Sequence, residues 1–357
     1  MAFSFGFSGD DIEEDTEEVL EQREGHAGGV AGGDATTPPL IEARVHGLEE
    51  LLATLPSTLS FTLLPLTSPG SHTARLPRRD LFDIRVQLMA EDTSLNSTSI
   101  PGLETSDLRP NIYEGGYKTW ECSLDLVKYL LDRGPRKDLD DMARVDHVIE
   151  MGCGSALPTA LLWQYALKER LGCQFTLTDY NEDVLRCVTV PNLLLAWVGT
   201  LDATTFPFSV ENPNPLAGED VREGDLEVTE ELKEAFRKSL SELGIRVTLV
   251  SGSWTPTERL LELVPSTPEM NTFILASETI YSPAALEAFT GAMVGLMGRV
   301  RSGKAIVAAK RVYFGVGGSV DGFREECSRR GCVAYEMEFE GLESDGVRRC
   351  LVEVQMC

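Results

Sequence analysis

The feature that most constrains this chain is a series of short apolar runs after residue 144, each followed by a turn and then a helical pattern. Short apolar runs bounded by turn residues predict buried strands. Strands that alternate with helices form a mostly parallel sheet with helices on both faces. The series therefore predicts an α/β fold. The predicted strands occupy residues 145–151, 175–178, 245–250, 273–276 and 305–309.

Two further strands, at 333–339 and 350–354, follow with only a turn at 341–346 between them. Strands joined by a turn alone must pair antiparallel. The predicted sheet is therefore Rossmann-like and seven-stranded, mostly parallel, with a C-terminal antiparallel hairpin.

The main domain is expected to span residues 107–357, with an insertion at 200–243 that is proline-rich at first and then acidic and helical. Residues 1–39 form an arm that is first acidic and then rich in glycine, alanine, threonine and proline. Because this composition cannot bury apolar surface, we expect the arm to be disordered.

The N-terminal extension at 40–106 is expected to contain a small β element. Residues 59–66 are mostly apolar. Within residues 81–89, every second side chain, at positions 82, 84, 86 and 88, is apolar. Strict alternation predicts a half-buried strand over 81–89.

The formal net charge of -25 bears on the partners of the protein. Such a surface repels nucleic-acid phosphates and attracts basic partners. The alternative is that the acidity serves only to keep the protein soluble.

No apolar run approaches the roughly 20 residues of a membrane span. The eight cysteines are scattered without a CxxC pair, which favours free thiols and no metal site. We expect an unsecreted monomer of the cytoplasm and nucleus that binds neither nucleic acid nor membrane.

The first strand of the main domain ends in a glycine-rich turn that contains Glu150, Gly152, Gly154 and Leu157. Glycines permit close approach of a ligand, and ligands bind at the carboxyl ends of the strands in such sheets. A dinucleotide site has a third glycine where this chain has Leu157, so a pyrophosphate cradle is disfavoured. Glu150 instead suits a cationic ligand such as the sulfonium of S-adenosylmethionine. An ordinary tight turn is the alternative.

The next two strands end in candidate nucleoside contacts. Asp179, followed by Tyr180 and Asn181, stands where an acidic side chain accepts the ribose hydroxyls. The alternative is that Asp179 or Asn181 caps the following helix, and both roles are compatible. Gly252, Ser253 and Trp254 end the third strand, where backbone groups and a stacked indole would hold adenine. A tryptophan buried in the core is the alternative for Trp254.

The fourth strand ends in Ser277 and Glu278, and Tyr281 follows shortly before a helix. An acid and a tyrosine at this position would orient an incoming nucleophile. The alternative is the start of a helix, with Ser282 as N-cap and Pro283 in the first turn.

A polar stretch at 109–123 precedes an amphipathic helix at 124–131, which is predicted to stop at 134–135. Its glycines and its tryptophan indicate a folded loop over a site.

Six motifs, in this order, resemble those of the histidine protein methyltransferases, which use S-adenosylmethionine. The motifs are YEGGYKTWECS, VIEMGCGSALP, LTDYN, VSGSW, LASETIYS and YFGVGG. The resemblance implies methylation of one histidine on a basic large-subunit ribosomal protein. It also implies a cofactor site at Thr119, Trp120, Glu121, Cys122, Ser123, Gly152, Asp179, Tyr180, Asn181, Gly252, Ser253, Trp254 and Ser277.

In this chemistry a neutral imidazole attacks the sulfonium methyl group directly. Imidazole has a pKa of about 6.5 and needs little activation. Glu278 is the candidate that bonds the other ring nitrogen and fixes the tautomer. Two alternatives stay open: a lysine methyltransferase of the same branch, and an acidic ribosome-assembly chaperone for a basic client.

Overall fold

The computed structural model describes residues 40–91, 116–133, 144–344 and 347–357. The predicted arm at 1–39 and the predicted domain boundary at 107 lie outside these ranges, so both stay predictions.

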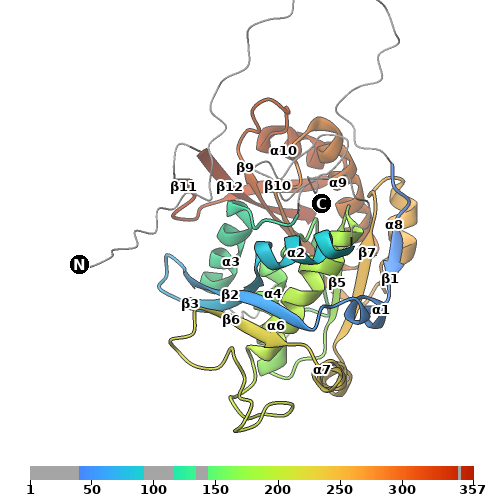
Figure 1. Cartoon of the computed structure of the whole chain (residues 1–357). Coiled ribbons are helices and arrows are strands. Elements are labelled where there is room, and N and C mark those ends of the chain that lie inside the picture. The colour runs from blue at the N-terminus through green and yellow to red at the C-terminus, as the bar shows by residue number, and fades with distance from the viewer. Residues whose placement is uncertain (1–39, 92–115, 134–143, 345–346) are drawn as a thin grey trace, which may run out of the picture.

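Within the described residues the main sheet has nine strands: β1 (Arg44–His46), β4 (His147–Met151), β5 (Gln174–Asp179), β7 (Arg246–Ser251), β8 (Asn271–Ser277), β9 (Ser302–Lys310), β10 (Cys332–Met337), β11 (Glu343–Ser344) and β12 (Val347–Met356). Their order is β1-β7-β5-β4-β8-β9-β12-β10, and β11 pairs with β12 beside this path. β7, β5, β4, β8 and β9 are parallel, whereas β12 is antiparallel to both of its neighbours. The predicted sheet with its closing antiparallel pair is thus confirmed (Figure 1).

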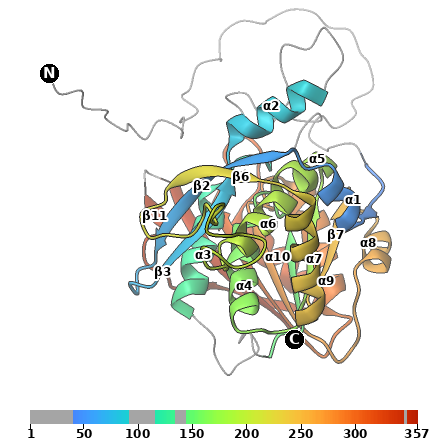
Figure 2. The same cartoon turned by 60° about the horizontal axis from the view of Figure 1, so that its bottom comes forward.

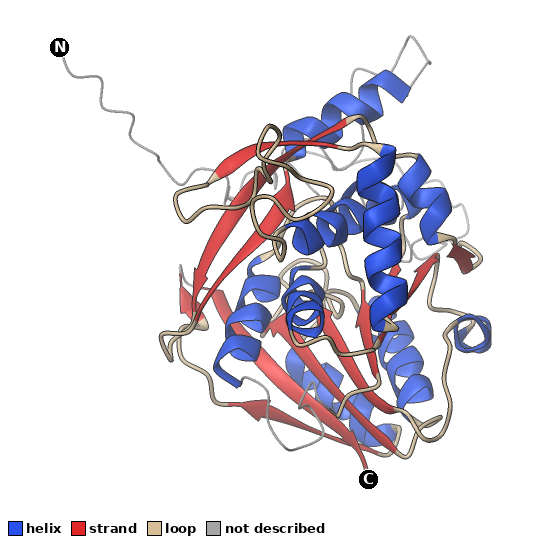
Figure 3. Ribbon diagram, turned by 90° about the horizontal axis from the view of Figure 1, so that it is seen from below, coloured by secondary structure: helices blue, strands red, loops and turns tan. Residues whose placement is uncertain are grey.

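Helices cover both faces of this sheet, as Figure 3 shows. The first face carries α3 (Glu121–Arg133), α4 (Leu157–Lys168), α6 (Val190–Val198) and α7 (Glu230–Leu243), and the second carries α8 (Thr257–Leu263), α9 (Pro283–Met297) and α10 (Val320–Arg329). Successive residues of β4 point to opposite faces. Val148 therefore packs in the core of the first face and Ile149 in that of the second.

The prediction of a strand over residues 81–89 is wrong, because this segment is the helix α2 (Leu81–Glu91). Ile84 and Leu88 are buried against the apolar cluster beneath α2, whereas Phe82 is exposed. Apolar residues four apart fit a helical face as well as a strand face, so the alternation alone could not separate the two. Figure 2 shows α2 at the margin of the molecule, beyond the small sheet.

The small sheet joins the N-terminal extension to the insertion. Its order is β3 (Thr73–Arg79), β2 (Thr58–Thr67), β6 (Glu223–Glu227), and both pairings are antiparallel. β2 confirms the strand predicted at 59–66, and α7 confirms the helix predicted in the insertion. Because β6 belongs to the insertion, the β element of the extension is completed by residues far along the chain.

The extension also reaches the main sheet. β1 lies antiparallel to β7 at its edge, and α1 (Leu48–Ala53) follows. Among the described residues, no helix is long and apolar enough to cross a membrane. All eight cysteines are free thiols, and only Cys357 is exposed.

Candidate active site

The candidate residues from distant parts of the chain meet at one edge of the main sheet. The last pairs of the parallel ladders join Met151 to Thr178 and to Ala276, and Asp179 to Ser251. The turns that follow these strands therefore lie side by side. This register confirms that the motifs after the first four predicted strands converge on one place.

The glycine-rich turn has the backbone geometry that the sequence analysis required. Gly152 and Gly154 have φ of 64° and 48°, in the left-handed region that favours glycine. A Cβ atom on Gly152 would lie 2.9 Å from Thr279 Cγ2 and 3.6 Å from the Trp254 ring. Glycine at this position therefore allows the segments after β7 and β8 to pack closely against the end of β4.

Glu150 is buried and fastens α4 to β4. Its Oε2 accepts a 2.9 Å hydrogen bond from the backbone N–H of Thr159, in the first turns of α4. Burial raises the pKa of Glu150 to about 8. The hydrogen bond to α4 is the role of Glu150 that the structure shows. Its attraction for a cationic ligand stays a prediction.

Asp179 connects the turns that follow β4 and β5. Its carboxylate accepts hydrogen bonds from the backbone N–H of Gly154 at 3.0 Å and of Asn181 at 3.1 Å. Asn181 stands at the N-cap of α5 (Glu182–Val184), but its side chain makes no capping bond there. A carboxylate can accept about four hydrogen bonds, and the binding of ribose hydroxyls by Asp179 stays a prediction. Tyr180, which lies between Asp179 and Asn181 in the chain, is half-buried.

The turn after β7 is held by the N-terminal extension. The Ser253 N–H donates to the Ile41 carbonyl at 2.9 Å, and the Ser253 hydroxyl accepts from the Ile41 N–H at 2.9 Å. A Cβ atom on Gly252, whose φ is 110°, would lie 2.7 Å from Ala43 Cα. The Ser253 backbone was expected to reach adenine, and in the structure its N–H bonds Ile41.

Trp254 combines the two roles considered for it. Its indole N–H donates to Thr178 Oγ1 at 3.1 Å, and its ring lies 5.6 Å from that of Phe289 in the second core. The far edge of the ring faces Gly152. Half-buried Trp254 therefore lines the candidate site while part of it packs in the core.

The segment before α3 lies over the glycine-rich turn, as expected of a loop that covers a site. Thr119 Oγ1 donates to Ser155 Oγ at 3.0 Å, and a Cβ atom on Gly154 would lie 3.2 Å from the Gly116 carbonyl oxygen. Residues 109–115 of this motif and the predicted helix stop at 134–135 lie outside the described ranges. Cys122 and Ser123 are buried in α3, and Glu121 Oε2 is buried without a hydrogen-bond partner among the described residues.

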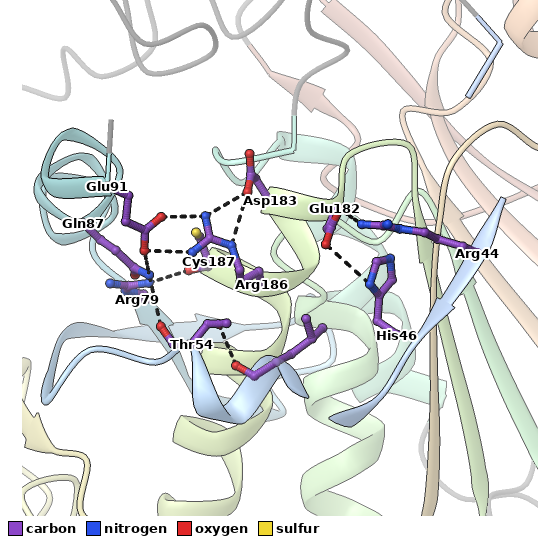
Figure 4. Close-up of polar contacts among 11 residues, drawn as sticks. Arg44, His46, Thr54, Arg79, Gln87, Glu91, Glu182, Asp183, Arg186 and Cys187 are labelled. Atoms are coloured by element: carbon purple, nitrogen blue, oxygen red, sulfur yellow. Dashed lines mark hydrogen bonds and ion pairs between the residues drawn. The ribbon is translucent and has the colours of Figure 1, made fainter. Parts of the chain in front are cut away.

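The extension is tied to the helices after Asp179 by ion pairs (Figure 4). Arg186, in the π-helical turn η1 (Leu185–Thr189), pairs with Glu91 of α2 and with Asp183, both at 2.8 Å. Buried Arg79 of β3 donates to the Cys187 carbonyl at 2.9 Å. The extension thus supports the turn that carries Asp179.

Glu278 is the centre of a second cluster at the same edge, where Ser277 ends β8. The φ of Glu278 is 59°, which is rare for a residue other than glycine. Backbone strain of this kind clusters at functional sites. The Tyr313 hydroxyl donates to Glu278 Oε2 at 2.6 Å, whereas Oε1 is buried without a hydrogen-bond partner among the described residues. Burial raises the pKa of Glu278, although the Lys310 ammonium, the Cys122 thiol and the Tyr313 hydroxyl lower it.

Tyr313 and Lys310 are the residues that the sequence analysis missed. The Lys310 ammonium lies 5.1 Å from the centre of the Trp120 ring, so it joins the loop before α3 to the Glu278 cluster. The signal was present in the YFGVGG motif, which begins at Tyr313 soon after β9.

Tyr281 was predicted to act beside Glu278, but the hydroxyl that reaches this carboxylate belongs to Tyr313. Tyr281 packs partly buried against the second core. Ser282 Oγ accepts from the Ala285 N–H at 3.2 Å, and Pro283 opens α9, which confirms the predicted helix start. The catalytic role of Tyr281 stays a prediction.

The strand order and the glycine-rich turn define a class: this is an S-adenosylmethionine-dependent methyltransferase. The described residues fit that cofactor, because the left-handed Gly152 and Gly154 and the buried Asp179 carboxylate meet at the carboxyl ends of β4 and β5, where a doubly wound sheet binds its ligand.

Comparison with known proteins agrees, although no family model matches the chain. The chain is 35% identical to histidine protein methyltransferase 1 of Saccharomyces cerevisiae over 351 residues, which is 90% of this chain and 89% of the relative. It is 34% identical to the Schizosaccharomyces pombe protein of that name, over 80% of this chain and 77% of the relative. The chain belongs to the histidine protein methyltransferase family.

The solved structures that match the fold are much less similar in sequence. The magnesium protoporphyrin IX methyltransferase of Synechocystis with bound SAM is 12% identical, covers 66% of this chain and 78% of its own, and has a TM-score of 0.34. An O-methyltransferase family protein of Burkholderia thailandensis is 10% identical, with 66% and 58% covered and a TM-score of 0.33. The assignment rests on the strand order and the sequence relatives, not on these two structures.

Proposed function

We propose that this protein methylates a histidine side chain of a basic large-subunit ribosomal protein. The choice of histidine is supported by the relatives at 35% and 34% identity, which are histidine protein methyltransferases. The Glu278 carboxylate is compatible with it, because one oxygen is held by Tyr313 and the other is buried without a partner among the described residues. Neutral imidazole has one N–H donor and one nitrogen lone pair. If Oε1 accepts that N–H, the ring is fixed in one tautomer with its lone pair directed away from Glu278.

The residues of this chain then have three tasks. S-adenosylmethionine, when bound, supplies an electrophilic methyl group. Imidazole has a pKa of about 6.5, so it is largely neutral at pH 7 and does not need a strong base. Glu278 orients the ring, and the Thr119–Trp120 loop excludes water, which together hold the reacting groups in place. The raised pKa of Glu278 suits it to take the N–H proton once the methylated ring becomes cationic.

The net charge of -25 supports a basic partner. Long-range attraction accelerates the encounter of oppositely charged proteins, whereas the RNA phosphates of a mature subunit repel an acidic enzyme. We therefore propose the free or newly assembling ribosomal protein as the substrate. The enzyme is proposed to act as a monomer in the cytoplasm and nucleus.

The test supplies the purified protein with methyl-labelled S-adenosylmethionine and either isolated large-subunit proteins or intact subunits. Mass spectrometry of the labelled peptides identifies the modified residue. We expect label on histidine and faster labelling of the free proteins. The rate should fall with salt, because the screening length drops from ~10 Å at 0.1 M to ~3 Å at 1 M.

Three controls sharpen this test. Replacing the target histidine by alanine should remove the label, whereas replacing nearby lysines should only slow it. Glu278→Gln should lower kcat by roughly 10²–10⁴-fold without weakening cofactor binding. Label on a lysine would overturn the histidine assignment in favour of lysine methylation, and preference for mature subunits would overturn the free-substrate model. An inactive cofactor-site variant that still supports ribosome assembly would favour the chaperone function.

A further inference from the structure

The loop at residues 312–318, called here the Phe314 loop, is a closed turn between β9 and α10. The Tyr313 N–H donates to the Gly318 carbonyl at 2.9 Å, and the Gly317 N–H donates to the Tyr313 carbonyl at 3.0 Å. Val312 and Ser319 form a β-bridge at its base. The loop is therefore fixed by its own backbone.

The Phe314 loop is also held against the start of α9. The Gly318 N–H donates to the Tyr281 carbonyl at 3.0 Å, and a Cβ atom on Gly318 would lie 2.0 Å from the Ile280 carbonyl oxygen. Only glycine fits at this position. The close contact joins the loop to the segment that directly follows Glu278.

Two neighbouring side chains of this loop have opposite environments. Tyr313 is buried and bonds Glu278, whereas Phe314 is 93% exposed and is flanked by exposed Val312 and Val316. Exposing a whole aromatic ring to water is unfavourable, at roughly 25 cal/mol per Å² of apolar surface. A rigid turn that presents such a ring one residue from the Glu278 hydrogen bond indicates a binding surface.

We infer that Phe314 is the aromatic anchor on which the substrate polypeptide docks, where it packs against an apolar side chain close to the methylated residue. The inference rests on the proposed function, because it assumes a polypeptide that places its target side chain at Glu278. Consecutive Cα atoms are about 3.8 Å apart, and an extended chain advances about 3.4 Å per residue. The apolar partner therefore lies within a few residues of the target.

This occupant follows from the position of the loop. Phe314 directly follows Tyr313, whose side chain bonds Glu278, while the Phe314 ring faces solvent, so a polypeptide bound at Glu278 can reach the ring within a few residues. The overall charge of -25 brings a basic protein to the surface but does not select one side chain. Aromatic anchors contribute much of the affinity of protein contacts and also give local specificity.

The test uses the full-length protein and two matched variants, Phe314→Ala and Phe206→Ala. Phe206 lies in the insertion and is 71% exposed, so it controls for loss of an exposed phenylalanine. Initial rates are measured with isolated large-subunit proteins and saturating methyl-labelled S-adenosylmethionine. We expect Phe314→Ala to raise the apparent KM about tenfold with kcat within about twofold. The Kd of the cofactor by calorimetry and the melting temperature should stay unchanged, and Phe206→Ala should match the wild type.

Other outcomes would contradict either the role of Phe314 or the proposed function. Equal KM values for the wild type and Phe314→Ala would overturn the anchor while leaving the proposed function intact. A large fall in the melting temperature would overturn it by showing that Phe314 packs on its own chain. Wild-type dimers that dissociate in Phe314→Ala, seen by sedimentation, would assign the ring to a second copy instead. No labelled protein with the wild type would overturn the proposed function and this inference with it.

Discussion

The Tyr313 hydroxyl donates a 2.6 Å hydrogen bond to the carboxylate of Glu278, a residue 35 positions earlier in the chain. The bond joins the loop after β9 to the turn after β8, and these parallel strands are neighbours through the pair Ser277 and Ala308. One carboxylate oxygen is thereby fixed, and the other lies buried without a partner among the described residues.

Replacing Tyr313 by phenylalanine should move the acid limb of the rate profile to higher pH. The hydroxyl stabilises the charged carboxylate, so its loss raises the pKa of Glu278 further. The enzyme then loses its charged Glu278 at a pH where the wild type keeps it. The measurement is kcat/KM against pH from about 5 to 8, which reports on the free enzyme and the free substrate. Because the free substrate imidazole, with a pKa of about 6.5, titrates identically in both experiments, the difference reports on Glu278. Identical profiles would show that Tyr313 has no electrostatic effect on the reaction.

Asp179→Asn should weaken S-adenosylmethionine binding at least about tenfold, because a neutral amide is a poorer acceptor for ribose hydroxyls than a carboxylate. Calorimetry gives the affinity, and circular dichroism should show an intact fold. Asp179→Ala should also lose about 1–3 kcal/mol of stability, because it leaves the Gly154 and Asn181 N–H groups without their acceptor. Tight binding of NAD to the wild type would contradict the cofactor assignment.

A chain that begins at Leu40 should melt within about 2 °C of the full-length protein, because the composition of residues 1–39 cannot support a core. A chain that begins at Leu48 should melt several degrees lower. It lacks the Ile41 contacts to Ser253, buried Ala43 and the pairing of β1 with β7. Differential scanning calorimetry measures both. A large loss already at Leu40 would show that the arm packs on the domain.

Glu150→Gln should stabilise the protein against heat, and more so as the pH rises. The pKa of Glu150 is about 8 in the folded protein, above its ordinary value of 4.5. Folding therefore opposes its ionisation, and the wild type loses stability as the pH rises from about 4.5 to about 8. Glutamine does not titrate and its carbonyl can still accept from Thr159. The difference in melting temperature should thus grow between pH 5 and 8. A constant difference would contradict the raised pKa.

The same variant separates the two roles of Glu150. If the carboxylate also attracts the cofactor cation, Glu150→Gln should weaken S-adenosylmethionine binding while it raises the melting temperature. Unchanged affinity would leave only the structural role, the hydrogen bond to α4.

Much of the site could be predicted because strand ends are local features. Gly152, Asp179, Gly252 and Glu278 each end or follow an apolar run, and parallel strands bring such ends together at one edge. Tyr313 could not be placed in this way, because it lies in a loop beyond its strand. A turn of the backbone, not a sequence spacing, directs its hydroxyl to Glu278.

The sequence by itself determined the class of fold, the order of the motifs and the edge of the sheet where they meet, because apolar periodicity and glycine turns act over a few residues. Tertiary structure alone decided the helical state of residues 81–91, where burial of Ile84 and Leu88 overrides an alternating pattern. It also decided that Ile41 occupies the polar groups of Ser253 and that Tyr313 holds Glu278. These contacts join segments far apart in the chain, so their geometry depends on how the whole domain packs.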